Sequence, residues 1–158
     1  MRISAPDEND LLFELLNPRS LTVGFKGGIV ATSAMTVFRM PISRSLPPTA
    51  EFWAQYVGGG ELADHRAESL LLHFLYGAIA GSIFGSIFAV VDTRSPYETE
   101  TKGLLAGLLY SIPFTLLGES IMLNHMLGMD LEPDESMIFH ASHLVYGITL
   151  GAWIGSRM

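Results

Sequence analysis

The chain of 158 residues contains no cysteine and only two lysines, and charged residues make up only 16% of it. The absence of cysteine excludes disulfide bonds, thiolate metal sites and cysteine nucleophiles. A soluble domain usually has about 25% charged residues, so the low charge predicts a membrane protein. The net charge of −7 argues against nucleic-acid binding, because that function needs a basic surface.

The chain also lacks the motifs of common enzyme classes. It has no GxSxG nucleophile motif, no phosphate-binding loop and no dinucleotide-binding glycine fingerprint. Its first ten residues contain one basic residue and several polar or acidic ones, and no hydrophobic core of a signal peptide follows them. We therefore predict a non-enzymatic protein whose first membrane segment directs its own insertion.

Hydrophobic residues, in contrast, make up 49% of the chain, and four segments approach the ~20 apolar residues that a membrane helix needs. The predicted spans are about 21–40, 70–91, 103–127 and 137–154. Between the first two, aromatic residues in the segment 49–57 predict a short helix on the membrane surface. We expect one all-α membrane domain over residues 1–158.

One pattern occurs twice, seventy residues apart, within the second and fourth spans. The first copy is His73, Tyr76, Gly77, Gly81 and Gly85, and the second is His143, Tyr146, Gly147, Gly151 and Gly155. The dipeptides Lys26-Gly27 and Lys102-Gly103 stand near the start of the first and second halves. This duplication predicts a four-helix bundle of two parallel two-helix repeats, related by an axis along the membrane normal.

Glycines at four-residue spacing predict tight helix packing. Between helices in lipid there is no hydrophobic driving force, and small residues allow the close contact on which association depends. The two glycine stripes at Gly77/Gly81/Gly85 and Gly147/Gly151/Gly155 therefore predict packed helix faces. Glycines that line a pore are the alternative interpretation.

The two histidines extend these stripes. Each imidazole lies four residues before a glycine, so it shares the packed face of its helix. By the direction of the spans, parts of the other helices reach the same leaflet. The predicted cluster consists of His73, His140, His143, Glu119 and Arg39.

Four interpretations of this cluster remain open. The side chains could serve only in structural hydrogen bonds, with Arg39 and Glu119 as an ion pair. A transition-metal site of His73, His140, His143 and Glu119 is the second, since imidazole and carboxylate are common zinc ligands. Haem held by one histidine from each repeat is the third. The fourth is a path for protons or solutes.

Basic residues indicate the orientation of the chain in the membrane. Six fall on the side of both termini and three on the other: Arg2, Arg19, Lys26, Arg94, Lys102 and Arg157, against Arg39, Arg44 and Arg66. We therefore expect a multi-pass cell-membrane protein with both termini in the cytoplasm.

The stretch Met35–Trp53 (MTVFRMPISRSLPPTAEFW), together with the later HLVYG pattern from His143, resembles an uncharacterised family of small four-span membrane proteins from haloarchaea. The resemblance implies a membrane location and a salt-adapted host, and it implies no activity. We predict a small membrane subunit or transport-like protein that packs with itself or with a larger membrane complex. The alternative is a metal- or haem-binding protein in electron transfer or metal handling.

The cofactor hypothesis predicts a measurable loss. If the histidines bind a metal or haem, detergent-purified protein contains it in stoichiometric amount, and the variant His73→Ala/His143→Ala does not. Metal analysis and an absorption spectrum of both proteins check this. A wild-type protein free of metal and haem would contradict the hypothesis.

Overall fold

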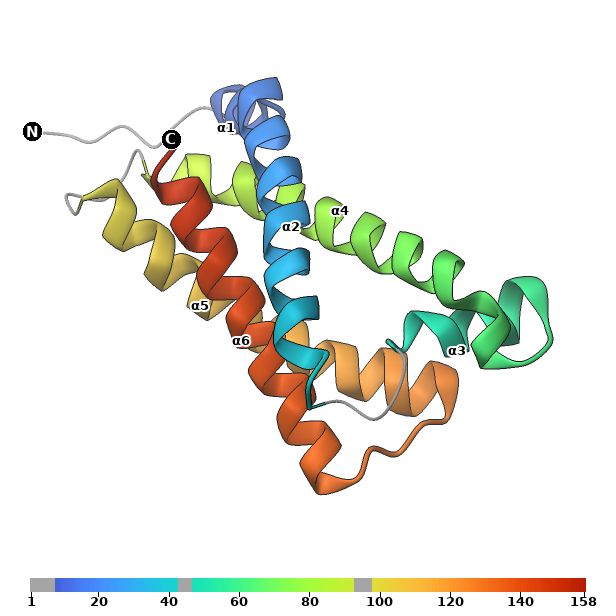
Figure 1. Ribbon diagram of the computed structural model, residues 1–158. Helices are drawn as coiled ribbons and strands as arrows, with labels where there is room; N and C mark the ends of the chain where they lie inside the picture. Colours follow the sequence, from blue (N-terminus) through green and yellow to red (C-terminus); the bar gives the residue numbers. More distant parts are fainter. Residues whose placement is uncertain (1–7, 43–46, 93–97) are drawn as a thin grey trace, which may run out of the picture.

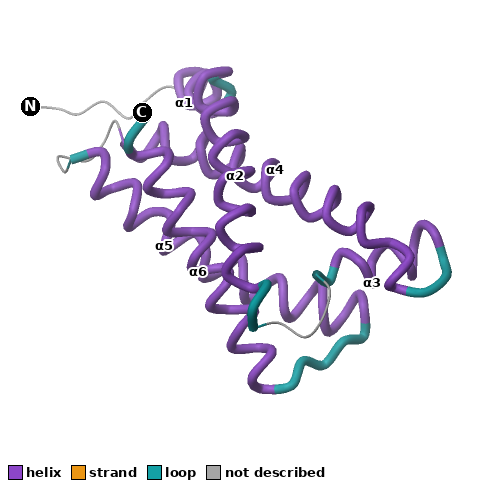
Figure 2. Tube along the Cα trace, viewed as in Figure 1, coloured by secondary structure: helices purple, strands orange, loops and turns teal. Residues whose placement is uncertain are grey.

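The computed structural model describes residues 8–42, 47–92 and 98–158, and within these ranges all regular structure is helical (Figure 1, Figure 2). The α-helices are α1 (Glu8–Leu15), α2 (Pro18–Arg39), α3 (Thr49–Trp53), α4 (Arg66–Asp92), α5 (Thr99–Leu117) and α6 (Pro133–Gly155). Three other helical segments adjoin them: a π-helical turn η1 (Ala54–Gly58) after α3, a 3-10 helix η2 (Leu62–His65) before α4, and a π-helix η3 (Gly118–Leu127) after α5.

Four helical segments in the described part of the chain are long and apolar enough to cross a membrane. They are Leu12–Arg39, Leu62–Asp92, Thr99–Leu127 and Pro133–Gly155, and each coincides with one of the predicted spans. Their outward faces carry exposed apolar side chains such as Ile83, Leu109 and Ile148. Helices that are apolar on all sides suit a lipid environment, and the protein is therefore a multi-pass membrane protein.

Local chemistry sets several helix ends. The side chain of Asn17 accepts a hydrogen bond from the Arg19 N–H at 3.0 Å and so caps α2. α6 begins with Pro133 at its first position, where the missing N–H costs no hydrogen bond. Gly128 ends η3 with a φ of 64°, a conformation that glycine adopts without strain.

The long helices form two hairpins, α2 with α4 and α5 with α6. α2 also packs along α6 and so joins the hairpins, whereas α4 and α5 touch at few points. α2 and α5 both begin at the end of the bundle where α4 and α6 finish, and the C-terminus lies there too (Figure 1). We call this the terminal end, and the end with α3 and the start of α6 the loop end.

Glycines line the seam of the first hairpin. Gly24 lies against the backbone of Gly81, and Gly28 lies against that of Gly77, so the two helices are antiparallel. A Cβ atom on Gly81 would come within 2.6 Å of the Gly28 Cα atom. The helices are therefore as close as their backbones allow.

The second hairpin has a seam of the same kind. Gly103 lies against Gly151, and Gly107 lies against Gly147. A Cβ atom on Gly151 would lie 2.9 Å from the Gly103 carbonyl carbon. Glycines thus meet in the same order along both hairpins.

The glycine contacts align the two hairpins in a register that differs from the one suggested by matching the two Lys-Gly dipeptides. Gly103 takes in the second seam the place that Gly24 takes in the first. Gly27 instead faces the other hairpin, where it packs on the side chain of Trp153. The dipeptides therefore occupy different structural positions, and that sequence match was a poor guide to register.

The buried core lies where the hairpins meet. Its residues come from α2, α4 and α6: Ala31, Met35, Ala80, Phe84, Phe88, Tyr146, Leu150 and Ile154. At the loop end, α3 is tied to α4 by the Thr49 hydroxyl, which donates to the Ser69 carbonyl at 2.9 Å. The Tyr56 hydroxyl donates to the Met126 carbonyl at 2.7 Å and ties η1 to η3. The segment 49–57 is helical, and its location at the membrane surface stays a prediction.

Because the helix backbones touch along the seams, adding one methyl group to a seam glycine should strongly destabilise the protein. Gly81→Ala and Gly151→Ala place a Cβ atom against backbone, which cannot move without separating the helices. Each variant should lose about 1–3 kcal/mol of stability, as overpacked cores do. Thermal unfolding in detergent measures the loss.

Gly118→Ala is the matched control, because its Cβ atom would meet only the ring of Phe139, at 3.3 Å. A side chain can shift by the few tenths of an ångström required. Equal losses at all three glycines would contradict the importance of backbone contact.

Candidate functional site

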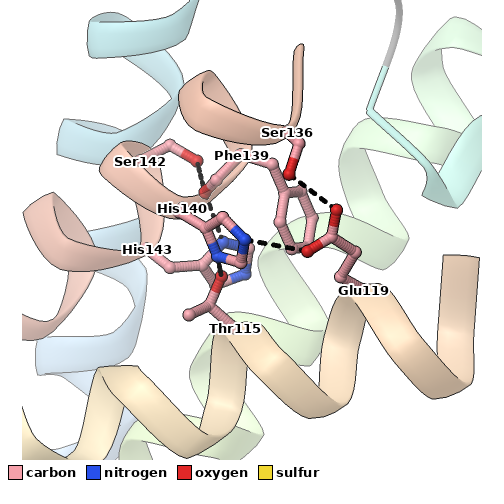
Figure 3. Close-up of polar contacts among 7 residues, drawn as sticks. All are labelled: Thr115, Glu119, Ser136, Phe139, His140, Ser142 and His143. Carbon is pink, nitrogen blue, oxygen red and sulfur yellow. Dashed lines mark hydrogen bonds and ion pairs between the residues drawn. The ribbon is translucent and has the colours of Figure 1, made fainter. Parts of the chain in front are cut away.

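Polar side chains gather near the loop end, where α5–η3 faces α6 (Figure 3). α6 carries Ser136, His140 and His143 within about two turns. Thr115 on α5 and Glu119 at the start of η3 lie opposite. Two neighbouring helices of one hairpin therefore supply this group.

Glu119 is the centre of a hydrogen-bonded network. Its Oε2 atom lies 2.8 Å from His140 Nε2, and its Oε1 atom accepts a hydrogen bond from the Ser136 hydroxyl at 2.7 Å. The other ring nitrogen of His140, Nδ1, lies 2.9 Å from the Thr115 hydroxyl. Each polar atom of the Glu119 and His140 side chains thus has a partner.

This network suits two protonation states of His140. The Glu119 carboxylate accepts, so His140 Nε2 donates to it. In the neutral ring, Nδ1 then accepts the hydroxyl hydrogen of Thr115, and in the charged ring Nδ1 donates to the hydroxyl oxygen. The network therefore clamps η3 to α6 in either state.

His143 makes different contacts from those of His140. Its Nδ1 donates to the Phe139 carbonyl at 2.8 Å, and the centroids of the two rings lie 4.3 Å apart. Because Nδ1 carries the hydrogen, Nε2 of the neutral ring is an acceptor. The side chain is 8% exposed, and Nε2 has no hydrogen-bond partner among the described residues.

A cavity adjoins His143. Residues from all four long helices line it, among them Arg39 on α2, His73 on α4, Phe114 on α5 and His143 on α6. Its volume is about 50 Å³, which is room for a few water molecules. The wall is mainly apolar, so these ionisable side chains are its main polar features.

His73 and Arg39 share this cavity without being paired to each other. His73 makes no hydrogen bond with any residue that the structure describes. Arg39 is close enough to His73 and His143, and also to Glu135, to interact with them electrostatically. The cavity thus combines a cation with two imidazoles.

The five residues of the predicted cluster therefore fall into two groups. His73, His143 and Arg39 line the cavity, whereas His140 and Glu119 belong to the network. His140 and Ser136 contact the two carboxylate oxygens of Glu119, and the Arg39–Glu119 ion pair stays a prediction.

The arrangement offers little to a metal ion. In residues 8–42, 47–92 and 98–158, no group of three or more His, Asp or Glu side chains is placed to hold one. His140 and Glu119 contact each other. His143 Nδ1, however, donates to the Phe139 carbonyl, and His73 lies on α4, where it lines the cavity. Metal and haem binding stay hypotheses.

The tyrosines of the repeated pattern also have different environments. The Tyr146 hydroxyl donates to the Gly77 carbonyl at 2.7 Å and so links α6 to α4. Tyr76 is 43% exposed, its ring packs on Phe114, and its hydroxyl has no hydrogen-bond partner in the part of the chain described. The tyrosine of the second copy therefore forms a hydrogen bond between the hairpins, whereas the tyrosine of the first copy forms none with the described residues.

Two residues of the network were missed in the sequence. Thr115 precedes Glu119 by four residues, and Ser136 precedes His140 by four. That spacing places each hydroxyl on the same helix face as its ionisable neighbour. The signal was present, but hydroxyl residues are common in membrane helices and the spacing alone is weak.

Comparison with known protein families finds a match over most of the chain. A family model described as "Family of unknown function (DUF6789)" matches residues 18–157, which include all four long helices and every residue of the network and cavity. No curated protein and no solved structure matches the chain.

The Glu119–His140 contact predicts coupling between the two side chains. In a double-mutant cycle with Glu119→Ala and His140→Ala, we expect a coupling free energy of about 0.5–1 kcal/mol, as for polar contacts between membrane helices. Unfolding of the four proteins in detergent measures it. As a control, the stability losses of Arg157→Ala, at the terminal end, and Glu119→Ala should be additive. Zero coupling between Glu119→Ala and His140→Ala would contradict a network that holds η3 to α6.

Proposed function

The chain belongs to the family of unknown function DUF6789, and we propose that it is a non-enzymatic, transport-like membrane protein with a solute-binding cavity between its hairpins. The observation that carries the proposal is the cavity, which all four long helices line. Its ionisable residues lie within membrane helices, where such groups are costly and commonly mark functional sites.

The unpartnered polar atoms support a ligand. A buried acceptor without a partner costs about 1–3 kcal/mol. His143 is only 8% exposed and its Nε2 has no hydrogen-bond partner among the described residues, and His73 adds a second imidazole without a hydrogen bond to them. An interface that served only stability would be better filled by apolar side chains. A bound solute or water offsets the cost.

The architecture also fits a transport-like role. We infer that the hairpins arose by duplication, because the repeated pattern and the matching order of seam glycines both relate them. In transporters with parallel repeats, the halves move about a site at their interface. Here the glycine seams stiffen each hairpin, while sparse contact between α4 and α5 leaves room for relative movement.

The proposed orientation places both termini in the cytoplasm. Of the nine basic residues counted for it, Arg2, Arg44 and Arg94 lie outside the described residues. The others favour the terminal end by four to two: Arg19, Lys26, Lys102 and Arg157, against Arg39 and Arg66. The acidic balance and scarce lysine support the further proposal of a salt-adapted, haloarchaeal host.

Two alternatives remain as proposals. As a small membrane subunit, the protein would pack with itself or with a larger partner through its apolar outward faces. As a metal- or haem-binding protein, it would depend on the contact between His140 and Glu119, which is the observation in its favour. Metal analysis and the absorption spectrum distinguish this second alternative.

The transport-like role predicts that the cavity is reachable by water from both sides of the membrane. Because the chain has no cysteine, Met35→Cys on the α2 wall supplies a single thiol. In membrane vesicles of either orientation, a charged methanethiosulfonate reagent should modify this thiol several-fold faster than the lipid-facing control Ile148→Cys. Mass spectrometry measures the rates.

Ser156→Cys reports the orientation in the same experiment and should react only from the cytoplasmic side. If Met35→Cys reacts from neither side, the cavity is dry and the proposal is wrong. Reaction from one side alone would contradict transport and favour the role of a membrane subunit.

A further inference from the structure

An apolar groove of about 430 Å³ lies between α4 and α5–η3, next to the cavity. Leu72 of α4 forms one wall, and Leu117, Ile121 and Met126 form the other. Three of these side chains are 40% or more exposed, namely Leu117, Ile121 and Met126, so the groove opens on the surface that lipid covers. Its volume falls in the range of about 300–1,000 Å³ for small-molecule pockets.

The groove and the cavity share part of their walls. Tyr76, Phe114, Gly118 and Met122 line both. α4 and α5 touch at few points here, and Gly118 contributes no side chain to the junction. A molecule in the groove therefore lies next to the cavity that His143 lines.

We propose that the groove and cavity together bind one long-chain carboxylic acid, with its hydrocarbon chain in the groove and its carboxyl group in the cavity. This inference rests on the proposed function, for which it names the class of solute.

The polar groups at the inner end match a carboxyl head. The acid O–H can donate to His143 Nε2, an acceptor without a hydrogen-bond partner among the described residues. The second oxygen can accept from the Tyr76 hydroxyl, which also lacks such a partner.

The shape of the site argues against other amphiphiles. In the part of the chain described, a groove of about 430 Å³ meets the cavity, whereas a diacyl lipid has two chains to accommodate. The cavity has room for a few small molecules of water size, which suits a head of three heavy atoms better than a phosphoester headgroup. A plain hydrocarbon would leave His143 Nε2 unpaired.

The head group should determine affinity. Moving a chain from lipid into an apolar groove gains little, because lipid tails are as apolar as the groove. The hydrogen bonds in the cavity are the contacts that lipid cannot supply. Binding should therefore depend on the carboxyl group much more than on the chain.

Palmitic acid is the probe, titrated into purified full-length protein in detergent and followed by native mass spectrometry. We expect one saturable site per chain, and an affinity for methyl palmitate that is about tenfold lower or more, because the ester cannot donate to His143. Gly118→Leu should weaken palmitate binding about tenfold by filling the junction. Leu109→Phe, on the lipid face outside the groove, should leave it unchanged.

Tyr76→Phe removes only one hydroxyl and serves if Gly118→Leu does not fold; it too should weaken palmitate binding. No saturable palmitate binding, or equal binding of the methyl ester, would overturn the inference. So would a tightly bound diacyl lipid or a second copy of the chain that competes with palmitate.

The cysteine experiment keeps this inference separate from the proposed function. Modification of Met35→Cys from both sides without palmitate binding would overturn only the assignment of the solute. Stoichiometric palmitate binding to protein whose Met35→Cys thiol never reacts would support the assignment and contradict transport. Protection of that thiol by palmitate would support both.

Discussion

Direct contact between helix backbones at glycine is the constraint on which the rest of the structure depends. In lipid, apolar side chains gain nothing by leaving one apolar surface for another, so helices associate through close contact and hydrogen bonds. Gly24 and Gly28 against Gly81 and Gly77 bring α2 onto α4, and the second hairpin repeats the arrangement. Each hairpin is therefore a stiff unit, and the fold reduces to the way in which two such units meet.

The cavity follows from where the seams end. Toward the loop end, the position four residues before the last seam glycine is an imidazole, at His73 in one hairpin and His143 in the other. Helices that must accommodate these rings cannot stay in backbone contact. On the facing helix, the α-helix changes to a π-helix at Gly118, five residues after Pro113, which lacks an N–H to donate. Space for the cavity opens at the depth where these changes coincide.

Two nearly identical patterns have come to serve different purposes. In the second copy, His143 is held by Phe139, and Tyr146 closes onto the Gly77 carbonyl across the hairpin boundary. In the first copy, the hydroxyl of Tyr76 has no hydrogen-bond partner among the described residues. The two copies therefore differ in the polar groups that they leave available to a ligand.

The sequence by itself determined the class of the protein, the four membrane helices and the faces on which they pack. These features depend on local composition and on spacing along one helix, which any reader of the chain can count. It also identified His73, His140, His143, Glu119 and Arg39 as residues near the same end of the bundle. The tertiary structure alone decided that they form two groups, with Glu119 and His140 in a network with Thr115 and Ser136, and the others around a cavity. It decided this because neighbouring positions on one helix point in directions about 100° apart, and the register between helices sets which neighbour each side chain meets. That register follows from contacts at glycines such as Gly24 and Gly103, and the matching Lys-Gly dipeptides did not reveal it.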